Sequence, residues 1–180
     1  MRSQIHIEND RLRICGLTDR DLSGLTAMRE CRQIYRYEPT FLAELQGAPE
    51  EALKEIQGMD LYTDRQCILG IFEKTDPQVL AGLAEFYDYK LSGKVISIGY
   101  RLRPEYWGKG LASCCCKALL DFLQNSTGVE LVTAHVISDN KASSRSLLKN
   151  GFIYLVTKAE DWGQDRPTTA EVYVFDVETR

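Results

Sequence analysis

The stretch that most constrains the fold is residues 96–122, where a strand pattern is followed directly by a glycine turn and a helix pattern. Apolar residues alternate over 96–102, as in a strand with one buried face, and Pro104 ends this pattern because proline lacks the N–H that a sheet ladder needs. Gly108 and Gly110 then flank a lysine, and apolar residues recur at helical spacing after them. The segment therefore predicts a strand, a tight turn and a helix in immediate succession.

The glycine turn predicts a binding site for an anion, most simply a phosphate. Glycine permits positive φ and close approach of a ligand to bare backbone, and the first turn of a helix offers unpaired N–H groups at the positive end of the helix dipole. The sequence Gly108-Lys109-Gly110-Leu111-Ala112-Ser113 matches neither the nucleotide-hydrolase loop nor the dinucleotide fingerprint. The simpler alternative is a strand-to-helix turn without a ligand.

A second segment with clear boundaries follows at residues 131–152. Residues 131–137 have the pattern of a strand, and Ser138-Asp139-Asn140 is typical of a helix N-cap. A helix is predicted over 141–149, and Asn150-Gly151 is typical of a left-handed C-cap. Capping of this helix is by itself a sufficient role for Asn140.

Both segments resemble signatures of one protein family. The run Trp107-Gly108-Lys109-Gly110-Leu111-Ala112 resembles the pyrophosphate loop of the GNAT superfamily, the acetyl-coenzyme A (acetyl-CoA) dependent N-acetyltransferases, whose signature is Arg/Gln-x-x-Gly-x-Gly/Ala. The glycine and alanine match, and tryptophan replaces the opening Arg or Gln, as in the branch of ribosomal-protein N-terminal acetyltransferases. Asn140-Lys141-Ala142-Ser143, with Gly-Phe eleven residues after the asparagine, resembles the second family segment. The resemblance spans Arg11 to Phe175.

The periodicity predicts one α/β domain over residues 1–180, and the resemblance implies the same order of elements. We expect a mixed, mostly antiparallel sheet of about seven strands and about four helices, with the sheet splayed between the fourth and fifth strands. The expected strands are residues 11–17, 66–73, 79–89, 95–102, 131–137, 152–157 and 170–176. The expected helices begin near residue 19 and near Pro49, and cover 110–125 and 141–149, with a loop of aromatic residues between the first two and a polar loop at 161–167.

The resemblance implies a coenzyme site in the opening between the fourth and fifth strands. Leu102 and Arg103 would meet the pantetheine by main chain, and Asn140 and Ser143 would meet it from the far side. Backbone N–H groups would hold the diphosphate, namely those of Gly108, Lys109, Gly110, Leu111, Ala112 and Ser113. The side chain of Lys109 either adds a charge to a phosphate or is solvated.

The catalytic positions of the family are where this sequence departs from it. The strand position that often carries the acidic base holds Ser97, and the position of the usual tyrosine acid holds Leu147. A hydroxyl is a poor base at its ordinary pKa, so Glu85 on the third strand and His135 on the fifth join Ser97 as candidates for proton transfer. Glu85 and His135 each also have a structural alternative: the Glu85 side chain would simply face water, and His135 would only be packed in the sheet.

Composition limits the classes of binding partner that the chain can have. With 22 basic and 26 acidic residues the net charge is −4, without the basic footprint of a nucleic-acid binder. Three of the six cysteines are consecutive, residues 114–116, and point in different directions on a helix, so reduced thiols and no metal site are expected. The absence of a signal-peptide or membrane-spanning pattern predicts a cytoplasmic protein.

These observations favour an N-acetyltransferase that transfers an acetyl group from acetyl-CoA to a primary amine by direct attack in a ternary complex. The acceptor would be a peptide N-terminal α-amine or a small amine, and the protein a monomer or homodimer. Glu38, Glu44, Glu50 and Glu51 would suit a cationic acceptor, although a solvated helix face explains them equally. The alternative is a non-catalytic module that binds acyl-CoA.

Overall fold

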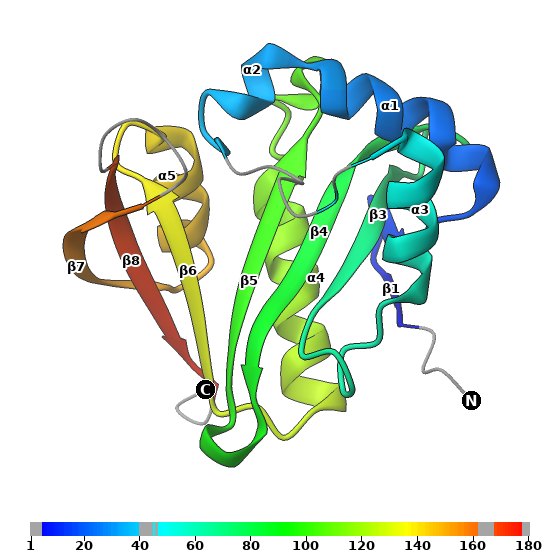
Figure 1. Cartoon of the computed structure of the whole chain (residues 1–180). Helices are drawn as coiled ribbons and strands as arrows, with labels where there is room; N and C mark the ends of the chain where they lie inside the picture. The colour runs from blue at the N-terminus through cyan, green and yellow to red at the C-terminus, as the bar shows by residue number, and fades with distance from the viewer. Residues whose placement is uncertain (1–4, 40–44, 46, 162–167, 178–180) are drawn as a thin grey trace.

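The computed structural model describes residues 5–39, 45, 47–161 and 168–177, and its frame is one sheet with helices on both faces (Figure 1). The strand order is β1-β2-β3-β4-β5-β6-β8-β7. The strands are β1 (His6–Glu8), β2 (Leu12–Cys15), β3 (Cys67–Glu73), β4 (Leu80–Lys90), β5 (Val95–Leu102), β6 (Leu131–Ile137), β7 (Ile153–Glu160) and β8 (Thr168–Asp176). The helices are α1 (Leu22–Glu30), α2 (Arg32–Tyr35), α3 (Pro49–Gly58), α4 (Leu111–Ser126) and α5 (Lys141–Lys149).

The sheet opens between β5 and β6, which confirms the predicted architecture. These strands are parallel and pair only at residues 95–97 with 131–133, whereas every other neighbouring pair of described strands is antiparallel. Beyond the pair Ser97–Thr133 the two strands diverge, as Figure 1 shows. Unpaired strand backbone therefore borders the opening.

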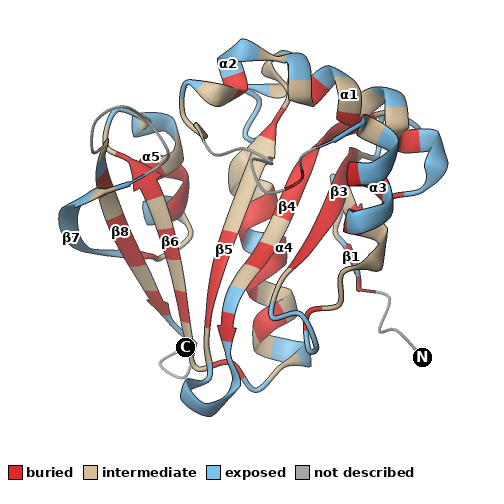
Figure 2. Cartoon of the chain, viewed as in Figure 1, coloured by how far each residue is buried: buried red, intermediate tan, exposed pale blue. Residues whose placement is uncertain are grey.

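The period-2 alternation of the strands sorts side chains onto two cores. On one face Ile96 and Ile98 are buried against α4, where the rings of Phe86 and Phe122 lie 5.7 Å apart. On the other face a second cluster joins the sheet to α1 and α3. Burial of each large apolar side chain contributes roughly 1.5–3 kcal/mol, so this alternation fixes which face every strand residue occupies. Figure 2 shows the resulting buried strands at the centre of the molecule.

The structure differs from the sequence prediction at three described elements. Strand β1 was not predicted: it is only three residues long, although Ile5 and Ile7 are buried and His6 and Glu8 exposed. A short helix, α2, follows α1 where a loop was expected, and the extended backbone of Cys31 (φ −81°, ψ 98°) separates the two helices. Strand β7 runs to Glu160 rather than Thr157. The expected loop at 161–167 lies outside the described residues apart from Asp161.

Two further predictions concern the ends of helices. The predicted cap before the first helix is present, since Asp21 Oδ2 accepts hydrogen bonds from the N–H and hydroxyl of Thr18 at 2.7 and 2.9 Å. Helix α5 has the expected N-cap at Asn140, and Gly151 has a positive φ of 88°. Among the described helices, none is both long enough and apolar enough to cross a membrane.

Candidate active site

The loop between β5 and α4 leaves a run of backbone N–H groups without protein partners. Gly108 and Gly110 have φ of 72° and 75°, which turn the chain into the start of α4. The first hydrogen bond of the helix is from Cys114 N–H to Gly110 O at 3.1 Å. Within the described chain no hydrogen bond engages the N–H groups of residues 108–113. Six backbone donors at the positive end of a helix can hold an anion.

Three side chains hold this loop in place. Trp107 Nε1 donates to Leu102 O at 2.8 Å, which ties the loop to the end of β5. Arg11 Nη2 donates to Lys109 O at 3.1 Å and brings a cation beside Gly110. Lys109 Nζ lies 5.5 Å from the centre of the Tyr106 ring. The tryptophan at the position of the family's Arg or Gln thus acts on the strand end, and Arg11, which the sequence did not reveal, supplies a nearby positive charge.

The open edge of β5 follows from its hydrogen bonds to β4. Arg103 N–H donates to Ala81 O at 2.9 Å and so points toward β4. Because backbone groups of successive strand residues point to opposite sides, those of Tyr100 and Leu102 face the opening toward β6. The Leu102 carbonyl there already accepts the Trp107 indole. Of the two residues predicted to offer main-chain groups, Leu102 therefore faces the opening and the Arg103 N–H is engaged in the sheet.

A cleft of about 440 Å³ lies over this opening. Its described lining includes seven of the predicted coenzyme residues, namely Leu102, Gly108, Gly110, Leu111, Ala112, Asn140 and Ser143. The other three predicted residues of the described chain, Arg103, Lys109 and Ser113, are not part of the lining. Two residues after α2, Tyr37 and Glu38, are also part of the described lining. The structure thus brings together two segments that are about thirty residues apart in the sequence.

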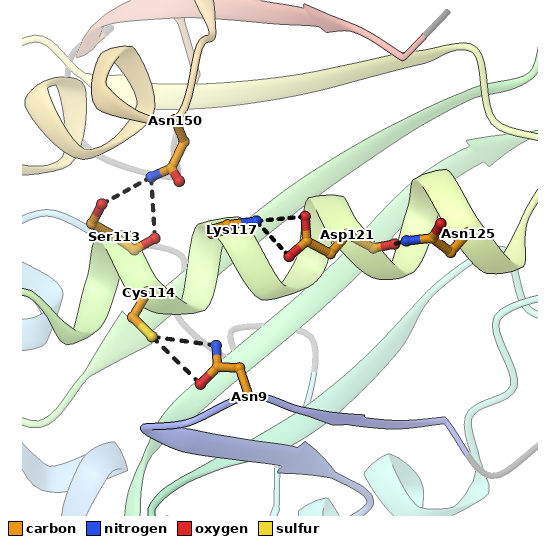
Figure 3. Close-up of polar contacts among 7 residues, drawn as sticks. All are labelled: Asn9, Ser113, Cys114, Lys117, Asp121, Asn125 and Asn150. Atoms are coloured by element: carbon orange, nitrogen blue, oxygen red, sulfur yellow. Dashed lines mark hydrogen bonds and ion pairs between the residues drawn. The ribbon is translucent and has the colours of Figure 1, made fainter. Parts of the chain in front are cut away.

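Helix α5 is fixed at both ends near the cleft. Asn140 Oδ1 accepts a hydrogen bond from Ser143 N–H at 3.2 Å, so its amide caps the helix. At the other end Asn150 Nδ2 donates to the carbonyl and hydroxyl oxygens of Ser113 at 3.1 and 2.9 Å, as Figure 3 shows, and to Ser146 O at 2.8 Å. The Ser113 side chain is therefore held toward α5. Asn150, which the sequence marked only as a cap, joins the two helices.

Glu171 on β8 anchors the first turn of α5. Its carboxylate accepts hydrogen bonds from Lys141 Nζ at 2.7 Å, Ser144 Oγ at 2.8 Å and Tyr173 OH at 2.6 Å. These bonds, that of Lys141 first, lower the pKa of Glu171 to about 2. The carboxylate is therefore ionised at neutral pH. Its bonds to Lys141 and Ser144 hold the first turn of α5, which Asn140 caps beside the cleft.

The three candidates for proton transfer are separated from one another. Glu85 Oε2 accepts a hydrogen bond from Arg101 Nη2 at 2.8 Å. The Ser97 hydroxyl is buried and lies 2.7 Å from Thr133 Oγ1, at the point where β5 and β6 diverge. His135 Nδ1 lies 2.8 Å from Glu160 Oε1. None of the three lines the described part of the cleft, and each has a structural partner.

Two cleft residues carry polar groups that the sequence analysis did not assign. Arg101 bridges Glu85 and Glu38, with Glu38 Oε2 at 3.7 Å. Tyr100 OH donates to Ser146 Oγ at 3.2 Å, and burial raises the pKa of this phenol well above its ordinary value. Leu147 is buried, so its position offers no side chain to the cleft. No local sequence pattern predicts these contacts, because they join residues that are far apart in the chain.

Comparison with known protein families shows to which family the chain belongs. A family model described as an acetyltransferase (GNAT) domain matches residues 11–153. The chain belongs to the GNAT acetyltransferase family. Its relative YoaA of Bacillus subtilis (strain 168), an uncharacterized N-acetyltransferase, is 31% identical over 147 residues, which are 81% of each chain. The predicted family is confirmed, and with it the prediction that the protein is an acyltransferase.

Solved GNAT structures share the fold at low identity. A GNAT-family acetyltransferase from Bacillus anthracis superposes with a TM-score of 0.80 at 18% identity, covering 97% of this chain and 99% of that one. Spermidine N-acetyltransferase from Vibrio cholerae, in complex with CoA and spermine, gives 0.76 at 18%, covering 93% and 96%. The ribosomal L7/L12 alpha-N-protein acetyltransferase RimL, in complex with CoA, gives 0.80 at 18%, covering 98% and 100%. These similarities establish a shared GNAT fold over nearly the whole chain.

Proposed function

We propose that this GNAT protein transfers the acetyl group of acetyl-CoA to a primary amine, either a peptide α-amine or a small amine. The observation that carries the proposal is the run of six backbone N–H groups, residues 108–113, at one side of the cleft. A diphosphate fits such donors because it offers several anionic oxygens where the helix dipole is positive. The guanidinium of Arg11 beside Gly110 adds to the positive potential.

The remaining contacts support a place for the pantetheine arm and the thioester. The backbone of Tyr100 and Leu102 faces the opening between β5 and β6, where an amide-bearing chain can pair with strand backbone. Asn140 and Ser143 line the opposite wall. When bound, acetyl-CoA would supply the activated acetyl group, and the walls would hold the amine against it. Well-oriented reactants gain roughly 7–11 kcal/mol over free ones, so positioning supplies much of the rate.

The acceptor class is proposed from the relatives. Two of the structural neighbours act, according to their names, on a polyamine, spermidine, and on a protein α-amine. Both acceptors carry a primary amine. We therefore propose a primary amine for this chain and choose between peptide and small amine by experiment.

Product analysis tests the proposal. Purified protein is incubated with acetyl-CoA and a panel of peptides and small amines, and mass spectrometry is used to find a product heavier by one acetyl group. Gly110→Asp tests the anion site, because aspartate tolerates positive φ but places a carboxylate where the diphosphate binds. Gly128→Asp is the matched control, since an added side chain there meets no atom within 4 Å and lies beyond the far end of α4.

The expected result is an acetylated product with wild type and Gly128→Asp, and at least about tenfold weaker CoA binding in Gly110→Asp, as one unfavourable charge contact of about 1.4 kcal/mol requires. CoA binding without acetylation of any panel member would favour the non-catalytic acyl-CoA module instead. Equal CoA affinity in both variants would contradict the assigned anion site.

A further inference from the structure

One carboxylate in the cleft, that of Glu38, accepts no hydrogen bond from the described part of the chain. Glu38 follows α2 and lines the cleft together with Tyr37 and Arg101. Its side chain is 28% exposed, and its nearest positive charge, Arg101 Nη2, lies 3.7 Å away, beyond hydrogen-bond distance. No hydrogen bond from a described residue reaches the Glu38 carboxylate. Partial burial of a carboxylate without hydrogen-bond donors costs free energy, because the charge loses part of its hydration.

The charges around Glu38 leave one negative charge in excess. Arg101 donates its short hydrogen bond, 2.8 Å, to Glu85 on β4. That pair is neutral, so the charge of Glu38 is only partly compensated. Tyr87, the other titratable group that interacts with Glu38, is neutral because burial raises the pKa of its phenol. The cleft lining also carries Asp139, Lys141 and Arg145, and Glu38 adds a negative charge in its own part of the cleft, which favours a cation there.

The position of this charge in the cleft matches the acceptor and not the coenzyme. The N–H run that suits phosphates belongs to residues 108–113, whereas Glu38 comes from the separate segment after α2. A carboxylate would repel the diphosphate, and it attracts an ammonium. The wall formed by Glu38 and Arg101 reaches the same β5 backbone that borders the opening.

We propose that Glu38 recognises a cationic amine acceptor in the acetyl transfer proposed above, and that it takes one proton from the bound ammonium. The ammonium becomes a neutral amine and Glu38 a carboxylic acid. The amine nitrogen then forms its bond to the acetyl carbon as the carbon–sulfur bond breaks. The sulfur leaves as thiolate and takes up a proton lost by the acetylated nitrogen, and Glu38 releases its own proton to solvent.

Burial supports this role for Glu38. Desolvation of its carboxylate raises the pKa above the ordinary 4.5, with Arg101 opposing the shift and Glu85 adding to it. A higher pKa makes a carboxylate a better base for an amine. Arg101 acts as a positioning residue, since it holds Glu38 between the cleft and Glu85.

The test compares two acceptors that differ in charge at pH 7: an alkylamine, which is protonated, and an arylamine, which is neutral. The variants are Glu38→Gln, Glu38→Asp as the conservative change, and Glu55→Gln as a matched control on the exposed face of α3. Thermal unfolding and CoA affinity are measured for each variant, so that loss of folding or of coenzyme binding is separated from loss of acceptor recognition.

Glu38→Gln should lower kcat/KM for the alkylamine by about 100-fold, the usual contribution of a general base, and by less than about threefold for the arylamine. Glu38→Asp should retain part of the rate, and Glu55→Gln all of it. The acid limb of the pH profile should lie above pH 4.5 in wild type and vanish in Glu38→Gln. If the wild-type protein does not acetylate the arylamine, the pH profile with the alkylamine alone tests the role of Glu38.

Two outcomes would overturn the inference, and they are distinguishable. If wild type acetylates the alkylamine and Glu38→Gln does so with an unchanged rate and pH profile, Glu38 has no part in recognition, while the proposed function stands. If wild type acetylates no amine, the proposed function fails and the role of Glu38 with it.

Discussion

Asn150 offers the sharpest test of how the phosphate loop is supported, because one side-chain amide joins α5 to the first turn of α4. Its Nδ2 donates to Ser113 O and Ser113 Oγ at 3.1 and 2.9 Å (Figure 3), and to Ser146 O at 2.8 Å. An amide has two hydrogens, so about two full hydrogen bonds are lost in Asn150→Ala. At about 1 kcal/mol each, the free energy of unfolding falls by about 2 kcal/mol, which is about 4–8 °C in Tm for a chain of this length.

Asn150→Asp separates hydrogen bonding from shape. Aspartate keeps the size of the side chain but turns its donor into an oxygen, which then faces the Ser113 and Ser146 carbonyls. Its negative charge also lies at the C-terminal end of α5, the negative end of the dipole. Thermal unfolding should therefore rank wild type above Asn150→Ala and Asn150→Ala above Asn150→Asp, with weaker CoA binding in both variants. An aspartate variant as stable as the alanine variant would refute the donor role.

Three further predictions follow from single contacts. Gly82→Ala places a methyl group against the carbonyl oxygen of Arg101, which the sheet holds, so urea unfolding should show a loss of about 1–3 kcal/mol. Glu171 has a folded pKa of about 2 against 4.5, so it stabilises the fold above pH 4.5 and loses this effect as pH falls toward 2; the difference in stability between wild type and Glu171→Gln should shrink by about 2–3 kcal/mol over that range. Ser97→Ala should cost about 1 kcal/mol while kcat stays within about threefold, and adding Thr133→Val should restore stability, because both partners of the 2.7 Å contact are then apolar.

The fold was predictable where a pattern is both periodic and bounded by turn residues. Helix α5 has a cap, an apolar face and a C-terminal glycine, and its predicted bounds agree with the structure. Strand β7 is an edge strand with mostly exposed side chains, as Figure 2 shows, so burial leaves no alternation to mark its end. The short helix α2 begins after Cys31 with neither glycine nor proline to mark the boundary, so no local signal separated it from the expected loop.

The coenzyme side of the site was predictable for a different reason than the acceptor side. The glycine loop makes its contacts with backbone, so a local sequence specifies it, and seven of the ten predicted residues line the cleft. The acceptor side depends on side chains that meet only after folding. Arg101 joins Glu38 and Glu85, which are 47 positions apart by sequence number. No local pattern encodes such a meeting, so the sequence suggested Glu38 only as one acid among four.

The most direct test of the central claim is an NMR titration of ¹⁵N-labelled protein with CoA and, separately, with pantetheine, which lacks the diphosphate. If backbone N–H groups hold the diphosphate, the amide signals of residues 108–113 should shift strongly with CoA and little with pantetheine, because only CoA gives these donors an anionic acceptor. If CoA binds and those six signals stay in place, the diphosphate lies elsewhere and the assignment of the site is contradicted.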